Sequence, residues 1–438
     1  MWRSRHGGCA LSGLRRAPGR LCGGFRAPLR AELRSAAAAA AIACAAGVIC
    51  AGAGAAQGIA ARSEAARSAA AEHAVVSSSA SAAPQLAATV LPHPSASVTS
   101  VAGLSCLSAR LCFAVGTATI IHGRSALTSN TGLIWRYDGS SWRLLDRLRI
   151  PQSSLAGISC SSASFCLAVG RAGNPESVTL ALRWNGHTWS RASAASPASS
   201  GNGDALASVA CPSRGSCFAV GGINLGEASA GLPNVLLEHW GGRRLSVVKA
   251  PDAGLLSIAC AGSRDCWATT YPPGAQVETN EIEHFNGHSW STVKLPVSMS
   301  GGEPGISCRT SAACWIVGDR NVNGLIPVAV HLVHGAWRST PMQIPRYPDV
   351  TLQGIDCASS TDCFAVGANE IVGPGITNPS SQEPFAEQWN GSVWQRVNVV
   401  GAGSAYLAAV SCTSDGFCVA GGSQQRGAKS VPIAAVAR

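Results

Sequence analysis

The chain has little of what surface helices need. Only 13% of its 438 residues are charged, 5% are aromatic and 3 are Met. Stretches rich in Lys, Glu and Leu, which form surface helices, are scarce, whereas 49 Gly residues favour turns between short strands. These shortages argue against a helical bundle and predict an all-β fold.

Motifs that carry catalysis are also missing. The sequence holds no paired carboxylates at a recognisable spacing, no nucleophile elbow and no Arg cluster for an acidic sugar. The spacing of His239, His284 and His331 does not place two of them on one metal, so we expect them to be structural or surface residues. We therefore predict no catalytic residue, no metal and no cofactor, and the sequence leaves enzymatic activity open while favouring a non-enzyme.

The positive charge is concentrated at the N-terminus. The formal net charge is +10, but residues 1–76 contain ten Arg and three Glu, which leaves 23 basic and 20 acidic residues for the rest. No cluster of Lys or Arg interleaved with aromatics follows, so we expect no nucleic-acid partner.

The N-terminus has the pattern of an export signal. An Arg-rich segment precedes an uncharged, Ala-rich run at 36–61. We predict that residues 1–61 are a signal peptide or, alternatively, an uncleaved N-terminal membrane anchor. Residues 62–84, rich in Ala and Ser, are expected to be a linker. The protein should therefore be secreted or extracytoplasmic, with a membrane contact only through a retained anchor.

A cysteine motif recurs seven times after the linker. Each copy has two cysteines six positions apart within a sequence such as "ISCSSASFCLAVG", and successive copies start 48 to 55 residues apart. Seven units of about 50 residues are typical of a β-propeller. The paired positions are Cys106 and Cys112, Cys160 and Cys166, Cys211 and Cys217, Cys260 and Cys266, Cys308 and Cys314, Cys357 and Cys363, and Cys412 and Cys418.

A second motif, such as "LALRWNGHTWSRA", follows in six of the units. An aromatic residue, Asn-Gly or a related pair and then usually Trp predict a tight hairpin of type I′, whose central residues both need positive φ. Each unit should thus hold four antiparallel strands, in the second unit at 155–160, 165–170, 178–184 and 189–193.

The last unit lacks a fourth strand, because only "SVPIAAVAR" follows its second one. Residues 85–92 resemble the end of a fourth strand from another unit. We predict that this N-terminal strand completes the last blade, so that a seven-bladed propeller occupies 85–438 and has no open edge.

The motifs resemble kelch-type propeller repeats, best seen in "FAVGG" at 218–222 and "YDGSSW" at 137–142. They are still more similar to the "SC…C.AVG" and "WNG..W" repeats of secreted actinobacterial propeller proteins. The resemblance implies a fold and no particular activity.

The cysteine pairs suit disulfides better than metal or redox chemistry. Their even number and the exported context favour disulfides, and a five-residue hairpin loop brings the two Cβ atoms within bonding distance. Zinc sites usually place two to four residues between paired cysteines, and no neighbouring group would systematically lower a thiol pKa.

The loops after second strands vary most in length, so we expect a ligand on that face and at the mouth of the channel. Candidate ligand-binding residues there are Asn224, Glu227, Tyr271, Glu278, Asn280, Asp319, Arg320, Asn321, Asn369 and Glu370. Glu238, Glu283 and Glu387 recur in third strands and are expected at exposed positions. The recurring Trp184, Trp189, Trp290, Trp389 and Trp394 should pack across strands.

Three functions fit these features. The first is an exported, non-enzymatic recognition or scaffold propeller, a monomer that binds an extracellular glycan or protein through its variable loops. The alternatives are an extracellular hydrolase or lyase acting on glycans, and a structural cell-envelope protein without a specific ligand.

Overall fold

The computed structural model divides the chain into two units, Met1–Ser77 and Ser78–Arg438. The structure describes residues 84–123, 127–147, 150, 152–173, 177–197, 203–223, 235–271, 278–300, 302–346, 348–371 and 382–437, all in the second unit. The expected leader at 1–61 and the linker up to residue 83 lie outside the described residues. No helix in the described part is long and apolar enough to cross a membrane.

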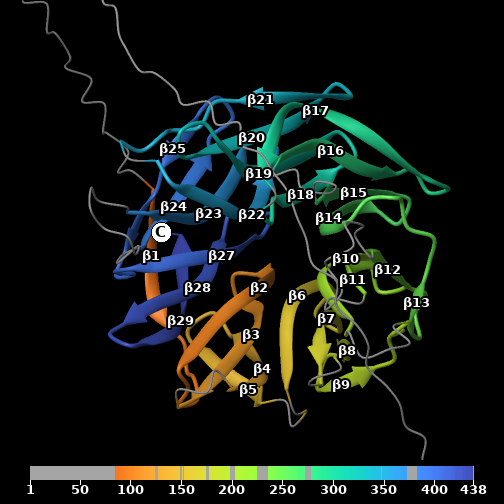
Figure 1. Ribbon diagram of the computed structural model, residues 1–438, viewed down its shortest axis with the longest axis vertical. Coiled ribbons are helices and arrows are strands. Elements are labelled where there is room, and N and C mark those ends of the chain that lie inside the picture. The colour runs from red at the N-terminus through yellow and green to blue at the C-terminus, as the bar shows by residue number, and fades with distance from the viewer. Residues whose placement is uncertain are drawn as a thin grey trace, which may run out of the picture. The chain divides into compact units, whose positions relative to one another are not determined.

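The second unit is a ring of seven four-stranded antiparallel blades, as predicted (Figure 1). The first strand of each blade faces the centre of the ring, and the following strands lie progressively further out. In the second blade the strands are β6 (Ser153–Ser162), β7 (Phe165–Ala172), β8 (Val178–Trp184) and β9 (Trp189–Ala192). These bounds agree with the four segments expected from the sequence to within two residues.

The other blades repeat this order. Blade 1 holds β2 (Val98–Ser108), β3 (Leu111–His122), β4 (Leu127–Tyr137) and β5 (Trp142–Arg147). Blade 3 holds β10 (Ala205–Ser213), β11 (Ser216–Gly222), β12 (Val235–Trp240) and β13 (Leu245–Val247). Blade 4 holds β14 (Leu255–Gly262), β15 (Asp265–Thr270), β16 (Glu278–Phe285) and β17 (Trp290–Ser300). Blade 5 holds β18 (Gly305–Thr310), β19 (Ala313–Asn321), β20 (Leu325–Val333) and β21 (Ala336–Thr340). Blade 6 holds β22 (Val350–Ser359), β23 (Asp362–Glu370), β24 (Gln382–Trp389) and β25 (Trp394–Arg396).

The N-terminal strand closes the ring, as expected. Blade 7 consists of β27 (Ala405–Cys412), β28 (Cys418–Arg426), β29 (Lys429–Ala437) and, as its outer strand, β1 (Gln85–Val90). β1 is antiparallel to β29 from Leu86 to Val90, and the short β26 (Asn398–Val400) pairs with its other edge. In Figure 1 the orange β1 lies among the blue strands of the C-terminus.

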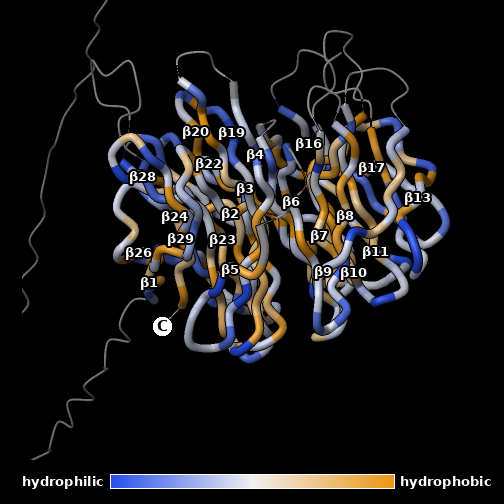
Figure 2. Tube along the Cα trace, turned by 90° about the horizontal axis from the view of Figure 1, so that it is seen from below, coloured by the Kyte–Doolittle hydropathy of each residue, from blue (hydrophilic) through white to orange (hydrophobic). Residues whose placement is uncertain are grey.

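The core lies between neighbouring blades. Second strands are buried on both faces; six consecutive residues of β7, from Phe165 to Gly170, are buried. In Figure 2 the hydrophobic colour follows the strands, and the turns are mostly hydrophilic. Side chains from adjacent blades interdigitate in each core cluster, for example Phe113 of blade 1 with Trp184 of blade 2 at 5.2 Å between ring centroids.

The glycine of the "AVG" motif is required by a close backbone approach. A Cβ atom at Gly170 would lie 2.0 Å from the carbonyl oxygen of Ser154, where the pairing of β6 with β7 shifts in register between Leu155 and Gly157. Any side chain here would force the first two strands apart.

All seven expected disulfides are present: 106–112, 160–166, 211–217, 260–266, 308–314, 357–363 and 412–418. Each joins the first two strands of one blade, with the two Cα atoms 3.9 to 4.1 Å apart. Such bonds persist in oxidising compartments.

The serine of the "SC" motif connects successive blades. The hydroxyl oxygens of Ser105 and Ser159 accept the N–H groups of Cys160 and Cys211 in the next blade, both at 3.0 Å. Ser411 accepts the N–H of Cys106 at 2.9 Å and so joins the last blade to the first.

The Asn-Gly hairpins differ from the expected type I′ turn. Gly186 has a φ of 100°, but Asn185 is not among the described residues with positive φ. Its side-chain oxygen instead accepts the N–H groups of His187 and Thr188 at 2.9 and 2.8 Å. The asparagine is therefore needed as a local hydrogen-bond acceptor rather than for left-handed backbone.

Candidate functional site

The expected ligand-binding residues fall on one face of three consecutive blades. Tyr271 follows β15, and Glu278 and Asn280 begin β16 in blade 4. Asp319, Arg320 and Asn321 end β19 in blade 5, whereas Asn369 and Glu370 end β23 in blade 6. Asn224 and Glu227 lie outside the described residues.

Several of these side chains hold blades together. Asp319 is 5% exposed and accepts a hydrogen bond from the hydroxyl of Ser300 in the preceding blade. Burial raises its pKa, and the nearby charges of Asp349 and Glu278 act in the same direction. Asp319 is thus a structural link at the edge of the face.

Asn369 and Glu278 have similar structural contacts. Asn369 is 5% exposed, and its side-chain oxygen accepts the N–H of Asp349 at 3.0 Å. Glu278 of blade 4 accepts the N–H of Asn321 of blade 5 at 2.9 Å. Tyr271 differs from them because it is 49% exposed, which leaves its ring available for stacking.

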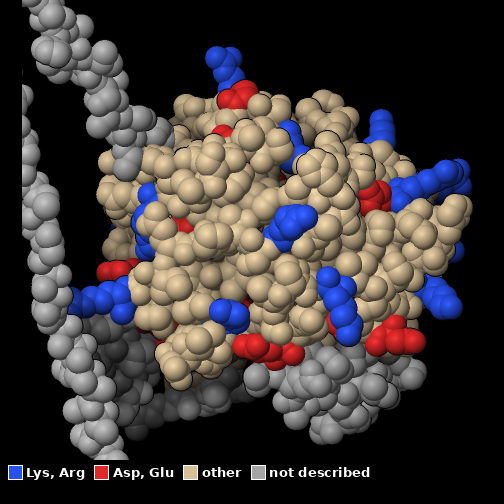
Figure 3. Space-filling model, turned by 90° about the horizontal axis from the view of Figure 1, so that it is seen from above, with Lys and Arg blue, Asp and Glu red and all other residues tan. Residues whose placement is uncertain are grey.

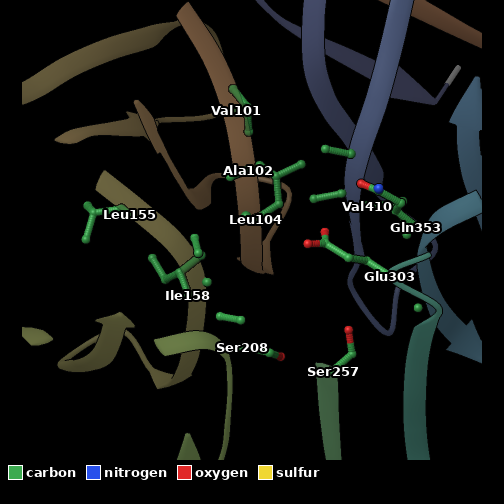
Figure 4. A pocket seen from close by; sticks show the side chains of 18 of the residues that line it. Val101, Ala102, Leu104, Leu155, Ile158, Ser208, Ser257, Glu303, Gln353 and Val410 are labelled. Carbon is green, nitrogen blue, oxygen red and sulfur yellow. The ribbon is translucent and has the colours of Figure 1, made fainter. Parts of the chain in front are cut away.

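A cavity of about 710 Å³ occupies the centre of the ring and is lined by first strands of all seven blades. Most lining residues are small or aliphatic, such as Ala102, Leu155 and Ile158. Figure 4 shows the carboxylate of Glu303 pointing into the cavity, with Gln353 close by. Among the described residues of this lining, Glu303 is the one that carries a charge.

Glu303 departs from the pattern of its repeat position. Five residues before the first cysteine, the other six blades have aliphatic side chains that are at most 4% exposed: Val101, Leu155, Leu206, Leu255, Leu352 and Leu407. In blade 5 Pro304 follows Glu303, and β18 begins only at Gly305. Glu303 thus lies before the ladder, exposed in the cavity. Aligning the repeats column by column would have found it.

Tyr406 of blade 7 lines the same cavity. Burial raises the pKa of its hydroxyl far above the usual value, and the negative charges of Glu303 and Asp319 act in the same direction. The hydroxyl therefore stays protonated, and this part of the cavity favours hydrogen-bond donors and cations over anions.

On the side of the molecule seen in Figure 3, Lys and Arg and Asp and Glu side chains are scattered over a largely uncharged surface. Among the described residues, no group of three or more His, Cys, Asp and Glu could hold a metal ion.

The recurring glutamates are buried, contrary to the exposed positions expected for them. Glu238, Glu283 and Glu387 are 0, 2 and 0% exposed, and the links from the preceding blades contact Glu238 and Glu387. Glu238 accepts the N–H of Ala195 at 3.1 Å, and Glu387 accepts that of Gln343 at 3.1 Å. Burial raises the pKa of both carboxyls to about 7.

The Glu238→Gln variant is expected to gain stability relative to the wild type as the pH rises from 5 to 8. The pKa is 4.5 ordinarily and about 7 when folded, so the stability that this group contributes is complete below pH 4.5 and lost by about pH 7. The full difference is at most about 3.5 kcal/mol, since each pKa unit corresponds to about 1.4 kcal/mol. Melting temperatures across this range test it. Parallel curves for both proteins would contradict it, and the exposed Glu383→Gln serves as the control.

The recurring tryptophans and histidines pack within and between blades, as expected. Trp184 and Trp189 face each other across a hairpin at 5.7 Å, and Trp389 and Trp394 do so at 5.9 Å. His284 stacks on Trp267 at 4.0 Å. These rings are structural rather than a carbohydrate-stacking set.

Neither a protein-family model nor a curated protein matches the chain. Among solved structures, YCF48 bound to D1 peptide is 12% identical with a TM-score of 0.48, and the match covers 82% of this chain and 99% of that one. Chaetomium thermophilum Sqt1 bound to the N-terminus of ribosomal protein L10 is 10% identical with a TM-score of 0.45, covering 81% and 99%. At these values nothing about function follows. By its own topology the chain is a seven-bladed β-propeller with one disulfide in each blade.

Proposed function

We propose that the chain is an exported, non-enzymatic recognition propeller that binds an extracellular protein or glycan at the mouth of its central channel. The Arg-rich leader followed by an Ala-rich run supports export, and seven disulfides suit an oxidising compartment. We also propose that the chain is related to kelch-like, secreted actinobacterial propellers, whose repeats its own repeats resemble.

One observation carries the proposal. Glu303, Gln353 and Tyr406 bring polar groups into a cavity that the repeat otherwise lines with small and aliphatic residues. They come from blades 5, 6 and 7, and the second strands of blades 5 and 6 end at or near Asp319, Asn369 and Glu370. A concave, mostly apolar site with a few convergent polar groups is the usual form of a binding site.

Binding by the full-length protein on arrays of extracellular glycans and of peptides tests this function. We expect saturable binding without turnover, weakened at least about tenfold in Glu303→Gln, because a hydrogen bond to a charged group contributes about 1.5–3 kcal/mol. Glu383→Gln, the same change at an exposed residue outside the cavity, should bind like the wild type. Hydrolysis or elimination of a glycan would instead support an enzyme. Equal binding by both variants would place the ligand elsewhere.

A further inference from the structure

A second cavity, of about 960 Å³, lies between blades 3 and 4. We call it the blade 3–4 cleft. It is lined by the link 248–253, by β11 and β12 of blade 3, and by β16, β17 and both hairpin turns of blade 4. It shares no lining residue with the central channel, so binding at either place can be measured independently.

The cleft contains a buried glutamate without the backbone cap of its counterparts. Glu238 and Glu387 each accept the N–H of the residue six positions after the tryptophan of the preceding fourth strand: Ala195 after Trp189, and Gln343 after Trp337. In the fourth strand of blade 3, Leu245 stands in place of this tryptophan. Counting six from Leu245 gives Pro251, which has no N–H to donate. Among the residues that the structure describes, the one hydrogen-bond donor to Glu283, which is 2% exposed, is the hydroxyl of Thr292 at 2.8 Å.

Blade 4 also lacks the cation that lies opposite the equivalent glutamate, Glu387, in blade 6. In blade 6 the cross-strand partner of Glu387 is Arg396, whose guanidinium lies 3.7 Å from the centre of the Phe385 ring. The charge of Arg396 favours the ionised form of Glu387. In blade 4 the residue opposite Glu283 is Thr292, which carries no charge.

A second carboxylate replaces an apolar side chain at this place. Two positions before the glutamate column, six blades have residues at most 7% exposed: Leu133, Leu180, Leu236, Val328, Phe385 and Ile433. Blade 4 has Glu281 there, on the same face of β16 as Glu283. The only ion pair of Glu281 among the described residues is with Lys294, at 3.9 Å. Because both side chains of this pair are exposed to solvent, it contributes little to stability.

We propose that the blade 3–4 cleft binds the arginine side chain of a partner polypeptide, with its guanidinium against Glu281 and Glu283. The guanidinium would take the place that Arg396 occupies in blade 6, with two carboxylates available to its fork of N–H donors. This site is separate from the channel mouth and does not depend on the proposed function.

The walls of the cleft fit an arginine and its peptide. Phe218 lies 4.6 Å from the ring of His239 and 5.3 Å from that of Phe285, and Phe285 lies 5.3 Å from Trp290. A planar guanidinium stacks on such rings. The other charged residues of the lining are Lys249, Asp252 and Arg264, besides the titratable His239 and His288.

Titration of the full-length protein with N-acetyl-arginine N-methylamide, followed by ligand-observed NMR, tests the proposal. We expect saturable binding that is at least about tenfold tighter than that of the citrulline analogue, which has the same shape and no charge. Glu283→Gln should lose at least about tenfold in affinity by the same argument. Thr292→Arg should abolish binding without lowering the melting temperature, because its own guanidinium then fills the site as in blade 6.

Two controls make the result decisive. Glu238→Gln, the same change at the equivalent position of blade 3, should bind the arginine probe like the wild type. If Glu283→Gln does not fold, Glu281→Gln tests the second carboxylate and should also weaken binding. Each of four results would overturn the proposal. The first is undetectable binding of the arginine probe, and the second is unimpaired binding by Thr292→Arg. The others are an affinity for the arginine probe equal to that for the citrulline analogue, or equal to that for the corresponding lysine derivative.

Discussion

Deletion of residues 85–92 should abolish the cooperative melting transition of the propeller. The segment supplies the outer strand of blade 7, where Leu86 is fully buried between blades 6 and 7. Leu91, 1% exposed, packs with blade 1, and the carbonyl oxygen of Pro92 accepts the indole N–H of Trp135 at 2.6 Å. One segment therefore contacts both sides of the closure.

The expected loss is large relative to the stability of a domain. Each buried leucine contributes about 1.5–3 kcal/mol, and each hydrogen bond of the β1–β29 ladder contributes about 0.5–1.5 kcal/mol. Their sum approaches the roughly 5–15 kcal/mol by which domains are usually stable, and the edge of β29 is left open. Circular dichroism and size-exclusion chromatography measure the effect. Leu86→Ala should give a smaller loss of about 2–5 kcal/mol, with the exposed His93→Ala as control. Unchanged melting of the deletion variant would refute the closure.

Reduction of the disulfides should lower the melting temperature more than any single substitution. Each bridge closes a loop of seven residues within a hairpin and contributes about 2 kcal/mol by restricting the unfolded chain. Seven such contributions, even if they are not additive, are comparable with the whole stability of a domain. Differential scanning calorimetry with and without reductant measures the change, and the mass of the intact protein should rise by fourteen hydrogens on reduction.

A double variant separates the bridges from other effects of reductant. Cys160→Ala with Cys166→Ala removes one bridge and should cost about 2 kcal/mol under oxidising conditions. Under reducing conditions this double variant and the wild type should have similar stabilities. A wild type that melts at the same temperature with and without reductant would show that the bridges do not stabilise the fold.

The repeats made most of the fold predictable. The spacing of paired cysteines indicated seven units, and the missing last strand pointed to 85–92 as its replacement. Both follow from local patterning and from the need to avoid an open sheet edge. The disulfides were predictable because a short hairpin places Cys160 opposite Cys166.

The binding sites were less predictable. The variable loops drew attention to Asp319 and Asn369, but both are buried: Asp319 joins blade 5 to blade 4, and Asn369 accepts a backbone N–H within blade 6. Glu303 and Glu281 were not among the predicted site residues, although each is a charged residue at a position where the other six repeats have apolar ones. Comparing the repeats position by position, rather than loop by loop, would have revealed both.

By itself the sequence determined the all-β class, the number of blades, the closing strand and the cysteine pairs, because these depend on periodicity and on contacts within one hairpin. Only the tertiary structure decided that Glu238, Glu283 and Glu387 are buried, since burial depends on how neighbouring blades pack. It also decided that Glu238 and Glu387 accept backbone N–H groups from the links before their blades. These hydrogen bonds join residues 43 and 44 positions apart, and no local pattern records them.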